Sequence, residues 1–568
     1  MAGENRLRKI DVDARDHHRS GLRYSPDEIH FYLIDFKKGV EFKTYADHKL
    51  PHARVIAIES DREFGASVLG RLDAILSERG ELFREVGAQD IKSFRAARPD
   101  VPMPRILLLV DEFQEFFTED DKYSQIASQL IDRLVRQGRA FGMHVLLGSQ
   151  SLGGAYALPR TTIGQMAVRI ALQCSESDAH QILSESNGAA RLLTRPGEAI
   201  YNNANGLLEG NSPFQVAWLD DKQRDGFLDQ LEVMYDKLPN HWPEPVVFEG
   251  NIPADPAVNE PLVKLIAASA EGPPPETKPR AWLGDAVAIA GPVEIRFFRR
   301  SGTNLLLVGQ DEEGALGILG TCIPTLAAQD VGRIDLFSDF NNPANEERWS
   351  PVLNAVKHHV RRSGPEEAAA VLADYAAELA RRQETPGEYR SWFLIIDDVS
   401  RFRDLRKSDD DFGFGGMDRN KTQSPSQMFT SLLKEGPAVG LHLLVWVDSY
   451  NNVDRWFSRQ MLREFEMRAV FQMSANDSSN LIDSPAASRL GNNRALLYSD
   501  ERGTAEKFRP YQPPTAEWLA TFQPRALPEP PPTPPASIAE TSQGSDGGNG
   551  SSSQTSAAVD DLSGWNVK

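Results

Sequence analysis

Apolar runs and amphipathic stretches alternate along the first half of the chain. The segment "RILLLVDEF" carries five consecutive aliphatic residues at 106–110, and "MHVLLGSQ" is a second short apolar run. Between them, "YSQIASQLIDRLVRQ" places Ile126, Leu130 and Leu134 at four-residue steps, as on one face of a helix. Continuous apolar strands that alternate with amphipathic helices are typical of a parallel sheet covered on both faces. The pattern therefore predicts an α/β fold.

The same order of elements recurs in the second half. A helical pattern, "EEAAAVLADYAAELARR", precedes the apolar run "WFLIIDDVSRF", and "QMFTSLLKEGPAVGLHLLVWVDS" repeats helix, turn and strand. The segment "VRIALQCSESDAHQIL" aligns with "MRAVFQMSANDSSNLI", so that Arg169 corresponds to Arg468 and Asp178 to Asp477. This similarity predicts an internal duplication that gives two modules with mainly parallel sheets.

Low-complexity stretches set the expected boundaries. Closely spaced prolines in "ASAEGPPPETKPRAW" exclude a helix and indicate a linker. The C-terminal tail is rich in Pro, then in Ser and Gly, and cannot bury enough apolar area to offset its ordering entropy. We therefore expect an N-terminal stretch at 1–27, a first module at 28–221, a connector and linker at 222–284, a second module at 285–510 and a disordered tail at 524–568.

Composition narrows the class of protein. The 568 residues carry a formal charge of -19 that is spread along the chain, so any contact with DNA would have to be local. Cys174 and Cys322 are too few for a disulfide framework or a cysteine metal site. No run approaches the roughly 20 apolar residues of a bilayer span, and the start lacks the apolar core of a signal peptide. We expect a cytoplasmic protein without a direct membrane span, which would need a partner to attach to a membrane.

Polar side chains follow the two predicted strands of the first module. Asp111 and Glu112 end one strand, and Gln150 ends the next at a comparable height. Such acids often only mark where a sheet meets solvent, but ligands of open parallel sheets also bind beyond these strand ends. One half of a nucleotide hydrolysis site consists of three groups. These are an acid that holds Mg²⁺ through water, an acid that polarises the attacking water, and an amide that senses the γ-phosphate.

Three segments carry a resemblance to a known family. In order and spacing, "FYLIDFKKGVEFKTYA", "PRILLLVDEFQEFF" and "GRAFGMHVLLGSQ" resemble the FtsK/SpoIIIE family of RecA-like ring ATPases, and the chain is also similar to type VII secretion ATPases. The resemblance implies two tandem RecA-like P-loop modules that use ATP and Mg²⁺. It also implies that Asp111 is the metal-side acid, acting through water, that Glu112 is the catalytic base and that Gln150 is the sensor.

The resemblance also concerns residues that would act on other molecules. It implies a homo-oligomeric ring in which Arg139 or Arg169 reaches the neighbouring subunit's nucleotide, although Arg169 could instead pair with Asp178 or contact DNA. The leading interpretation is an ATP-driven translocase of double-stranded DNA, with these cations near a central pore: Lys37, Lys38, Arg160 and Arg169. The alternatives are a protein-translocating ATPase of the type VII secretion kind, with protein cargo or a membrane-anchored partner, and a non-catalytic interaction scaffold.

The phosphate-binding half of the site is missing from the first module. Hydrolysis needs a glycine loop whose amides face the phosphates, a Lys on the β and γ groups and a Ser or Thr on Mg²⁺. No Gly-Lys dipeptide occurs in the sequence, and the polar segment "RLRKIDVDARDHHRSG" stands where the family has this loop. We therefore expect the chain as given to hydrolyse ATP at no more than background.

The second module carries a partial version of the loop. In "NLLLVGQDEEGALGIL", Gly309 and Gly314 have the required spacing, but Ala315 and Leu316 replace the Lys and the Ser or Thr. Further departures are the acids Asp311 and Glu312 beside the expected phosphates, Asp398 after Asp397 in place of Glu, Asp448 in place of the sensor amide, and Pro437 in place of Arg139. The pattern predicts a degenerate nucleotide site at Gly309, Gly314, Asp397 and Asp398. Because backbone amides need no lysine, the sequence leaves weak nucleotide binding open.

Overall fold

A computed structural model describes seven ranges of the chain: residues 23–37, 42–151, 158–237, 242–270, 278–357, 359–407 and 423–522. Three expected segments lie wholly or mostly outside the described residues: the tail at 524–568, most of the N-terminal stretch, and the linker residues 271–277. Within the described ranges, no helix combines the length and the apolar character that a membrane span requires.

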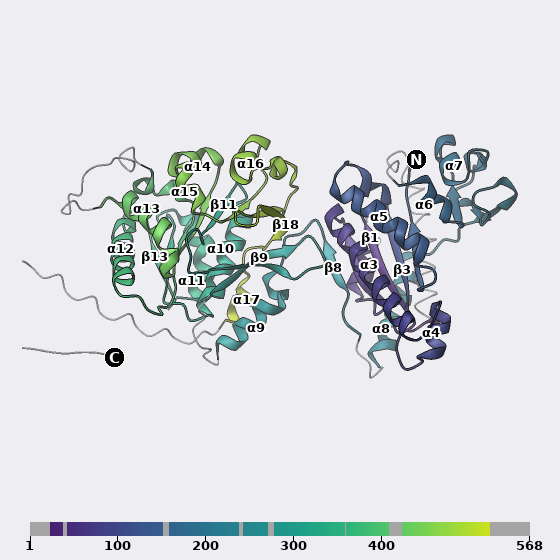
Figure 1. Ribbon diagram of the computed structural model, residues 1–568, viewed down its shortest axis with the longest axis horizontal. Coiled ribbons are helices and arrows are strands. Elements are labelled where there is room, and N and C mark those ends of the chain that lie inside the picture. The colour runs from purple at the N-terminus through teal and green to yellow at the C-terminus, as the bar shows by residue number, and fades with distance from the viewer. Residues whose placement is uncertain are drawn as a thin grey trace, which may run out of the picture. The chain divides into compact units, whose positions relative to one another are not determined.

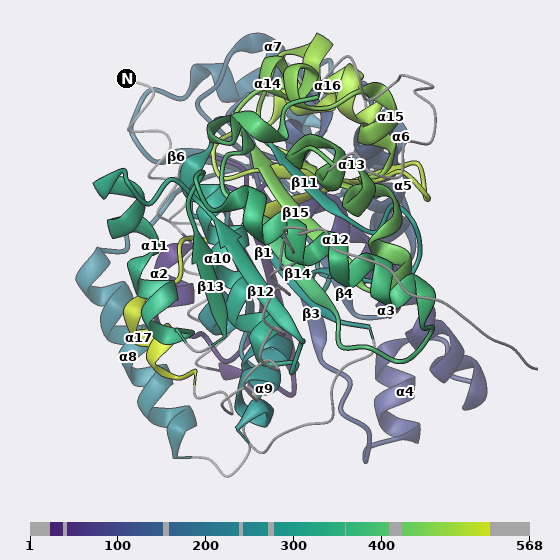
Figure 2. The same cartoon turned by 90° about the vertical axis from the view of Figure 1, so that its left-hand side faces the viewer.

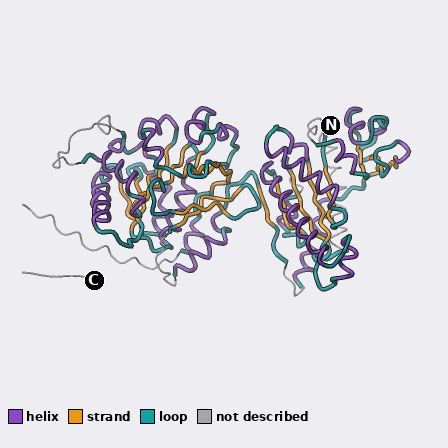
Figure 3. The backbone as a smooth tube through the Cα atoms, in the orientation of Figure 1, coloured by secondary structure: helices purple, strands orange, loops and turns teal. Residues whose placement is uncertain are grey.

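The first module is built on a parallel sheet with the strand order β4-β3-β1-β2-β8 (Figures 1 and 3). Its strands are β1 (Ile29–Asp35), β2 (Ala53–Ile58), β3 (Arg105–Asp111), β4 (Met143–Leu147) and β8 (Val246–Glu249). Alternate residues of β3 contribute to two hydrophobic clusters, one on each face of the sheet. This double burial explains why the strand reads as a continuous apolar run.

Helices cover both faces of this sheet. One cluster contains residues of α3 (Arg62–Glu85) and α5 (Lys122–Gln137), and the other contains residues of α2 (Lys43–Asp47) and α8 (Asp221–Asp236). A shorter helix, α4 (Ile91–Ala97), begins at Asp90, whose side chain accepts a hydrogen bond from the Ser93 amide as an N-cap.

The first module extends beyond its expected end. The region 222–284 was expected to be a connector, but α8 packs against the first sheet and β8 pairs in parallel with β2. Beside the main sheet, a three-stranded antiparallel sheet consists of β5 (Arg169–Leu172), β6 (Glu198–Asn202) and β7 (Asn211–Gln215). Two short helices, α6 (Arg160–Gln165) and α7 (Glu176–Ile182), flank β5 in the chain.

The second module contains a ten-stranded mixed sheet with the order β10-β9-β18-β17-β16-β11-β15-β14-β12-β13. The parallel part consists of β11 (Leu305–Val308), β12 (Arg333–Phe337), β13 (Val360–Ser363), β14 (Trp392–Ile396), β15 (Leu441–Val447) and β16 (Met467–Val470). The antiparallel part adds β9 (Arg280–Ala286), β10 (Pro292–Arg296), β17 (Ala495–Ser499) and β18 (Thr504–Pro510). The fold is therefore α/β with two sheet-based modules, as the sequence predicts.

Two groups of helices enclose the second sheet (Figures 1 and 2). One hydrophobic cluster includes residues of α9 (Glu260–Ser269), α10 (Glu312–Ala327), α11 (Pro343–Ala355) and α17 (Ala516–Ala520). The other includes residues of α12 (Ala368–Glu384), α13 (Pro425–Glu435), α14 (Tyr450–Trp456), α15 (Arg459–Arg463) and α16 (Ala475–Ile482). Because α9 and α17 belong to this core, the second module is wider than the expected range 285–510.

The internal duplication is visible in detail. The strand order β4-β3-β1-β2 matches β15-β14-β12-β13. Arg169 and Arg468, at the starts of β5 and β16, donate hydrogen bonds to backbone carbonyls at the same sequence separations of 3, 6 and 13 residues. Ser175 and Ser474 cap the helices that follow, each accepting from the amide three residues later. The two modules thus share local side-chain chemistry as well as topology.

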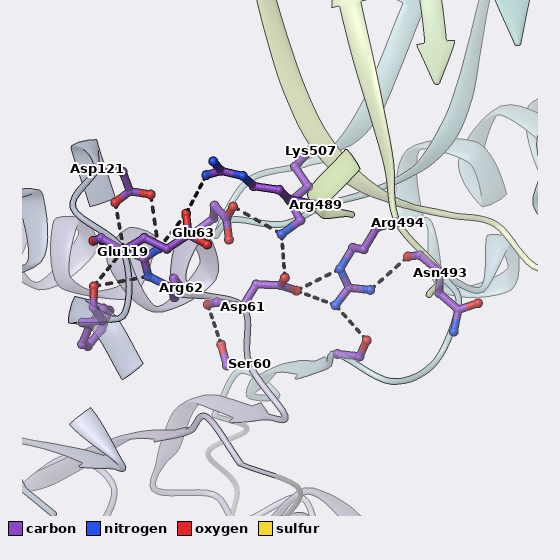
Figure 4. Close-up of polar contacts among 12 residues, drawn as sticks. Ser60, Asp61, Arg62, Glu63, Glu119, Asp121, Arg489, Asn493, Arg494 and Lys507 are labelled. Carbon is purple, nitrogen blue, oxygen red and sulfur yellow. Dashed lines mark hydrogen bonds and ion pairs between the residues drawn. The ribbon is translucent and has the colours of Figure 1, made fainter. Parts of the chain in front are cut away.

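Polar contacts connect residues of the two modules (Figure 4). Asp61, which precedes α3, accepts hydrogen bonds from Arg494 and from Lys507 Nζ, the latter at 2.8 Å. Burial would raise the pKa of Asp61, but Lys507 and Arg494 outweigh it and hold the pKa below its usual value. A more exposed ion pair joins Arg489 to Glu119 at 3.0 Å. Asp61 therefore stays ionised as the acceptor for two cations of the second module.

Candidate functional site

The acids of the first module lie at the carboxyl end of β3. Asp111 is the last residue of the strand and is half-buried, while Glu112 is buried and has a φ of 55°, in the left-handed region. This conformation is uncommon for a residue with a side chain and is favoured only when its surroundings impose it. Here the following short helix, Phe113–Phe117, buries three phenylalanines against the module core. Their packing fixes the sharp turn at Glu112.

Three groups surround the Glu112 carboxylate. The Lys37 ammonium lies 3.3 Å from Oε2, the Gln114 side-chain amide donates to the same oxygen, and the backbone N–H of Gln150 donates to it at 3.4 Å. The structure therefore brings Glu112 and Gln150 together, as their positions at neighbouring strand ends predict. The contact uses the backbone N–H of Gln150, and Gln150 is an exposed residue.

Lys37 and Gln114 are members of this cluster that sequence reasoning missed. Lys37 was expected near a pore, whereas its ammonium pairs with Glu112. A signal for this arrangement exists, since β1 and β3 are parallel neighbours with Asp35 in register with Asp111. The residues just after both strands therefore reach the same edge of the sheet.

The two candidate arginines lie in different surroundings. Arg139 is exposed in the turn after α5. Arg169 donates to the carbonyls of Ile163, Met166 and Ile182 at 3.1 to 3.3 Å and also to that of Leu183. These bonds tie the end of α7 to β5. A role of either arginine at a neighbouring nucleotide stays a prediction, and Arg169 would have to leave its carbonyls to fulfil it.

In the second module, the start of α10 is occupied by the protein's own acid. Gly309 has a φ of 138°, and a Cβ there would lie 2.7 Å from the Cβ of Phe471. The Asp311 carboxylate accepts from the Gly314 N–H at 2.9 Å and caps the helix. Backbone N–H groups at a helix N-terminus are the donors that a bound phosphate uses. Asp311 thus takes the place that a phosphate oxygen would need.

The buried carboxylate of Asp397 is likewise saturated. It accepts from the Arg348 guanidinium at 2.8 Å, the Trp349 indole N–H at 2.6 Å and the Ser338 hydroxyl at 2.8 Å. Burial raises the pKa of Asp397, and the Arg348 charge works against that shift. Arg348 also pairs with Glu312 at 3.1 Å. A guanidinium therefore lies where the family's metal-side acid would face a cation.

The remaining acids of the second module form local contacts. Asp398 has a φ of 57°, matching Glu112, but its carboxylate accepts from the Ser400 hydroxyl at 2.5 Å and from Arg401 Nε at 2.9 Å. Asp448 accepts from the Asn452 side chain at 2.7 Å. Donors of the protein itself thus engage Asp311, Asp397 and Asp398. This arrangement supports the interpretation of a degenerate site.

Comparisons with known proteins identify relatives for part of the chain. Residues 22–154 match the FtsK/SpoIIIE family. The chain is 26% identical over 204 residues to the ESX secretion system protein EccC of Geobacillus thermodenitrificans, covering 35% of this chain and 13% of that protein. It is 27% identical over 222 residues to the DNA translocase FtsK of Helicobacter pylori, covering 37% of this chain and 24% of that protein. The chain thus spans a minor part of the length of these relatives.

A solved structure extends the likeness of the fold to both modules. The cytoplasmic domain of the Thermomonospora curvata type VII secretion ATPase EccC matches with a TM-score of 0.59 at 19% identity. The match covers 91% of this chain and 61% of that one. The predicted resemblance to the FtsK/SpoIIIE family is thus confirmed for residues 22–154, and the two-module α/β fold predicted from the sequence is confirmed as well.

Proposed function

We propose that the chain, whose residues 22–154 match the FtsK/SpoIIIE family, is part of a protein-translocating motor of the type VII secretion kind. In this proposal the first module contributes the acids of a nucleotide site, and the second is a structural module without turnover. ATP and Mg²⁺ are the ligands that the family implies, and copies of the chain would assemble into a ring.

The filled site of the second module is the observation that carries this proposal. Arg348 donates to Asp397, and the Asp311 carboxylate accepts from the Gly314 N–H at the start of α10, so groups of the protein itself already engage both parts of the predicted site. A module in that state keeps its fold without responding to nucleotide. When one of two tandem modules has lost its nucleotide site, the pair suits a motor that transmits force along a single chain.

The chemistry of the first module supports a role for its acids in a shared site. Asp111 would hold Mg²⁺ through water, and Glu112 would orient the attacking water. Bound Mg²⁺ would supply charge neutralisation at the phosphates. The Lys37 ammonium lies 3.3 Å from Glu112 Oε2 and would have to move aside for Glu112 to contact the attacking water.

The surroundings of the cations that were expected at a DNA pore favour protein over DNA as the cargo. Lys37 is paired with Glu112, and Arg169 is bound to backbone carbonyls. Lys38 lies outside the described residues, and the side chain of Arg160, the first residue of α6, also falls outside them. With a net charge of -19, the chain has no general attraction for a polyanion. The second candidate function, movement along DNA, rests on the similarity to FtsK.

A titration of labelled duplex DNA distinguishes the two cargoes. We expect little binding to the full chain at either about 50 or about 200 mM salt, because the net charge is -19 and the described pore candidates Lys37 and Arg169 already contact Glu112 and backbone carbonyls. Binding is measured by fluorescence anisotropy, with Lys37→Gln as the test variant and Lys237→Gln as the matched control. Tight binding at the lower salt that falls by about 10³-fold at the higher salt, and is weakened by Lys37→Gln alone, would favour the DNA translocase.

A further inference from the structure

A histidine and two carboxylates from distant parts of the chain meet on one face of the first module. His48 directly follows α2, and Asp229 and Glu232 lie three residues apart on α8. The His48 Nδ1 lies 3.6 Å from Asp229 Oδ1 and 3.7 Å from Glu232 Oε2. The ligand atoms of all three side chains lie within 4.8 Å of one another. Within the described residues, no other group of His, Cys, Asp and Glu side chains has this spacing.

Packing and hydrogen bonds hold the backbone on both sides of this cluster. The Leu50 N–H donates to the Tyr45 carbonyl at 3.0 Å, which closes the end of α2, and both side chains are buried. Leu228 and Leu231, next to the two acids on α8, belong to the same hydrophobic cluster as Leu50 and Tyr45. The histidine and the acids are therefore presented by two packed helices.

The two acids of the cluster differ from the acids that precede them on α8. Arg224 pairs with Asp221 and with Asp225, both at 3.1 Å. For the two acids near His48, this imidazole is the only partner of basic type within 4 Å among the described residues, and it lies beyond ordinary hydrogen-bond distance from both. Like charges one turn apart on a helix repel each other. A divalent cation at the centre of the cluster would neutralise both carboxylates.

The donor set and its spacing fit Zn²⁺. This ion binds imidazole nitrogen and carboxylate oxygen at about 2.0 to 2.2 Å, so the ligand atoms of a tetrahedral site lie roughly 3.3 to 3.6 Å apart. The separations of 3.6 and 3.7 Å from the His48 nitrogen are close to this value. Mg²⁺ and Ca²⁺ prefer oxygen ligands, whereas imidazole favours Zn²⁺ and related ions. Three protein ligands leave the fourth position to water.

We propose that His48, Asp229 and Glu232 bind one Zn²⁺ ion, with water as the fourth ligand, and that this ion links α2 to α8. The link joins the helix that follows β1 to a helix that the sequence analysis assigned to a connector. None of the three ligands belongs to the acid cluster around Glu112. The inference therefore goes beyond the proposed function and does not depend on it.

Titration of Zn²⁺ into the full chain, after treatment with a chelator, tests the site by calorimetry. His48→Gln, Asp229→Asn and Glu232→Gln should each weaken one equivalent of bound Zn²⁺ by at least about tenfold, since even the partners of metal ligands commonly contribute about 10- to 100-fold. Asp236→Asn, at an exposed position of the same helix, is the matched control and should bind like the original chain. Zn²⁺ bound elsewhere is common to all variants, so equal binding by all four overturns the proposal.

Amide hydrogen exchange locates the bound ion. Zn²⁺ should slow exchange in α2 and in the middle of α8, because the ion adds a link between these two helices. In His48→Gln the same amides should exchange at one rate with and without Zn²⁺, and Mg²⁺ should not replace Zn²⁺ in the original chain. Slowing that is absent, or that persists in His48→Gln, overturns the proposal.

Thermal unfolding provides an independent check. Excess Zn²⁺ should raise the melting temperature of the original chain and of Asp236→Asn, because an ion that binds only the folded state stabilises it. The melting temperature of Asp229→Asn should change less, and circular dichroism before heating establishes that this variant is folded. An equal rise in all three proteins overturns the proposal. These readouts require neither nucleotide nor DNA, so failure of the metal site is distinguishable from failure of the proposed function.

Discussion

Replacing Arg348 with alanine is expected to destabilise the second module by about 3 to 5 kcal/mol, the cost of leaving a buried carboxylate without its cation. The Asp397 carboxylate is buried, and Trp349 and Ser338 donate to one oxygen while Arg348 donates to the other. The guanidinium also lies over the Trp446 ring at 5.7 Å from its centroid. Removal of Arg348 therefore leaves the buried Asp397 carboxylate without a compensating positive charge.

Urea unfolding of the full chain, followed by tryptophan fluorescence, measures this effect. Arg361→Ala is the matched control, because its ion pair with Asp374 is exposed on both sides and should be worth less than about 1 kcal/mol. Adding Asp397→Asn to Arg348→Ala should restore part of the lost free energy of unfolding, since the amide carries no charge. A loss for Arg348→Ala no larger than for Arg361→Ala would contradict the assigned role of Arg348.

The second large effect is expected in a chain whose first module has been given a phosphate loop. This variant carries a copy of residues 302–332 inserted directly before Ile29. Within the copy, the residues between the counterparts of Gly309 and Gly314 are changed, and Ala315 and Leu316 are replaced by Lys and Thr. In this variant, Glu112→Gln is expected to lower the rate of ATP hydrolysis by about 10² to 10⁴-fold, the usual contribution of a general base. Asp398→Asn should leave most of the rate, because Asp398 is bound to Ser400 and Arg401.

Phosphate release at saturating ATP and Mg²⁺ measures this asymmetry, and thermal unfolding establishes that the variants are folded. Equal losses from Glu112→Gln and Asp398→Asn would show that the second module turns over, in conflict with its filled site. A completed first module without any hydrolysis would count against the roles predicted for Asp111 and Glu112.

The sequence predicted the strands that are buried on both faces. Segments such as β3 and β15 read as continuous aliphatic runs because helices cover both sides of the sheet. The short strand β8 went unrecognised, since its four residues directly after Pro245 carry no periodic signal and become a strand only by pairing with β2. Its neighbour α8 was also included in the expected connector, although Leu228, Leu231 and Tyr235 form a buried face at helical spacing.

The candidate site was predicted as far as strand ends determine it. Asp111, Glu112 and Gln150 were recognisable because parallel strands end at one edge. The contacts of Lys37 with Glu112 and of Arg348 with Asp397 were not, because each joins residues that are distant in the chain and depends on side-chain packing. Arg169 shows the same limit, since its carbonyl partners lie on both sides of β5 in sequence.

ATP hydrolysis by the chain as given is expected to stay at background, because its sequence contains no Gly-Lys phosphate loop. Purified chain is incubated with ATP and Mg²⁺, and phosphate release is compared with that of the Glu112→Gln variant. We expect the same background rate for both, because positioning and charge neutralisation supply nearly all of phosphoryl-transfer catalysis. Turnover that Glu112→Gln abolishes would contradict it and reveal a phosphate site of another kind.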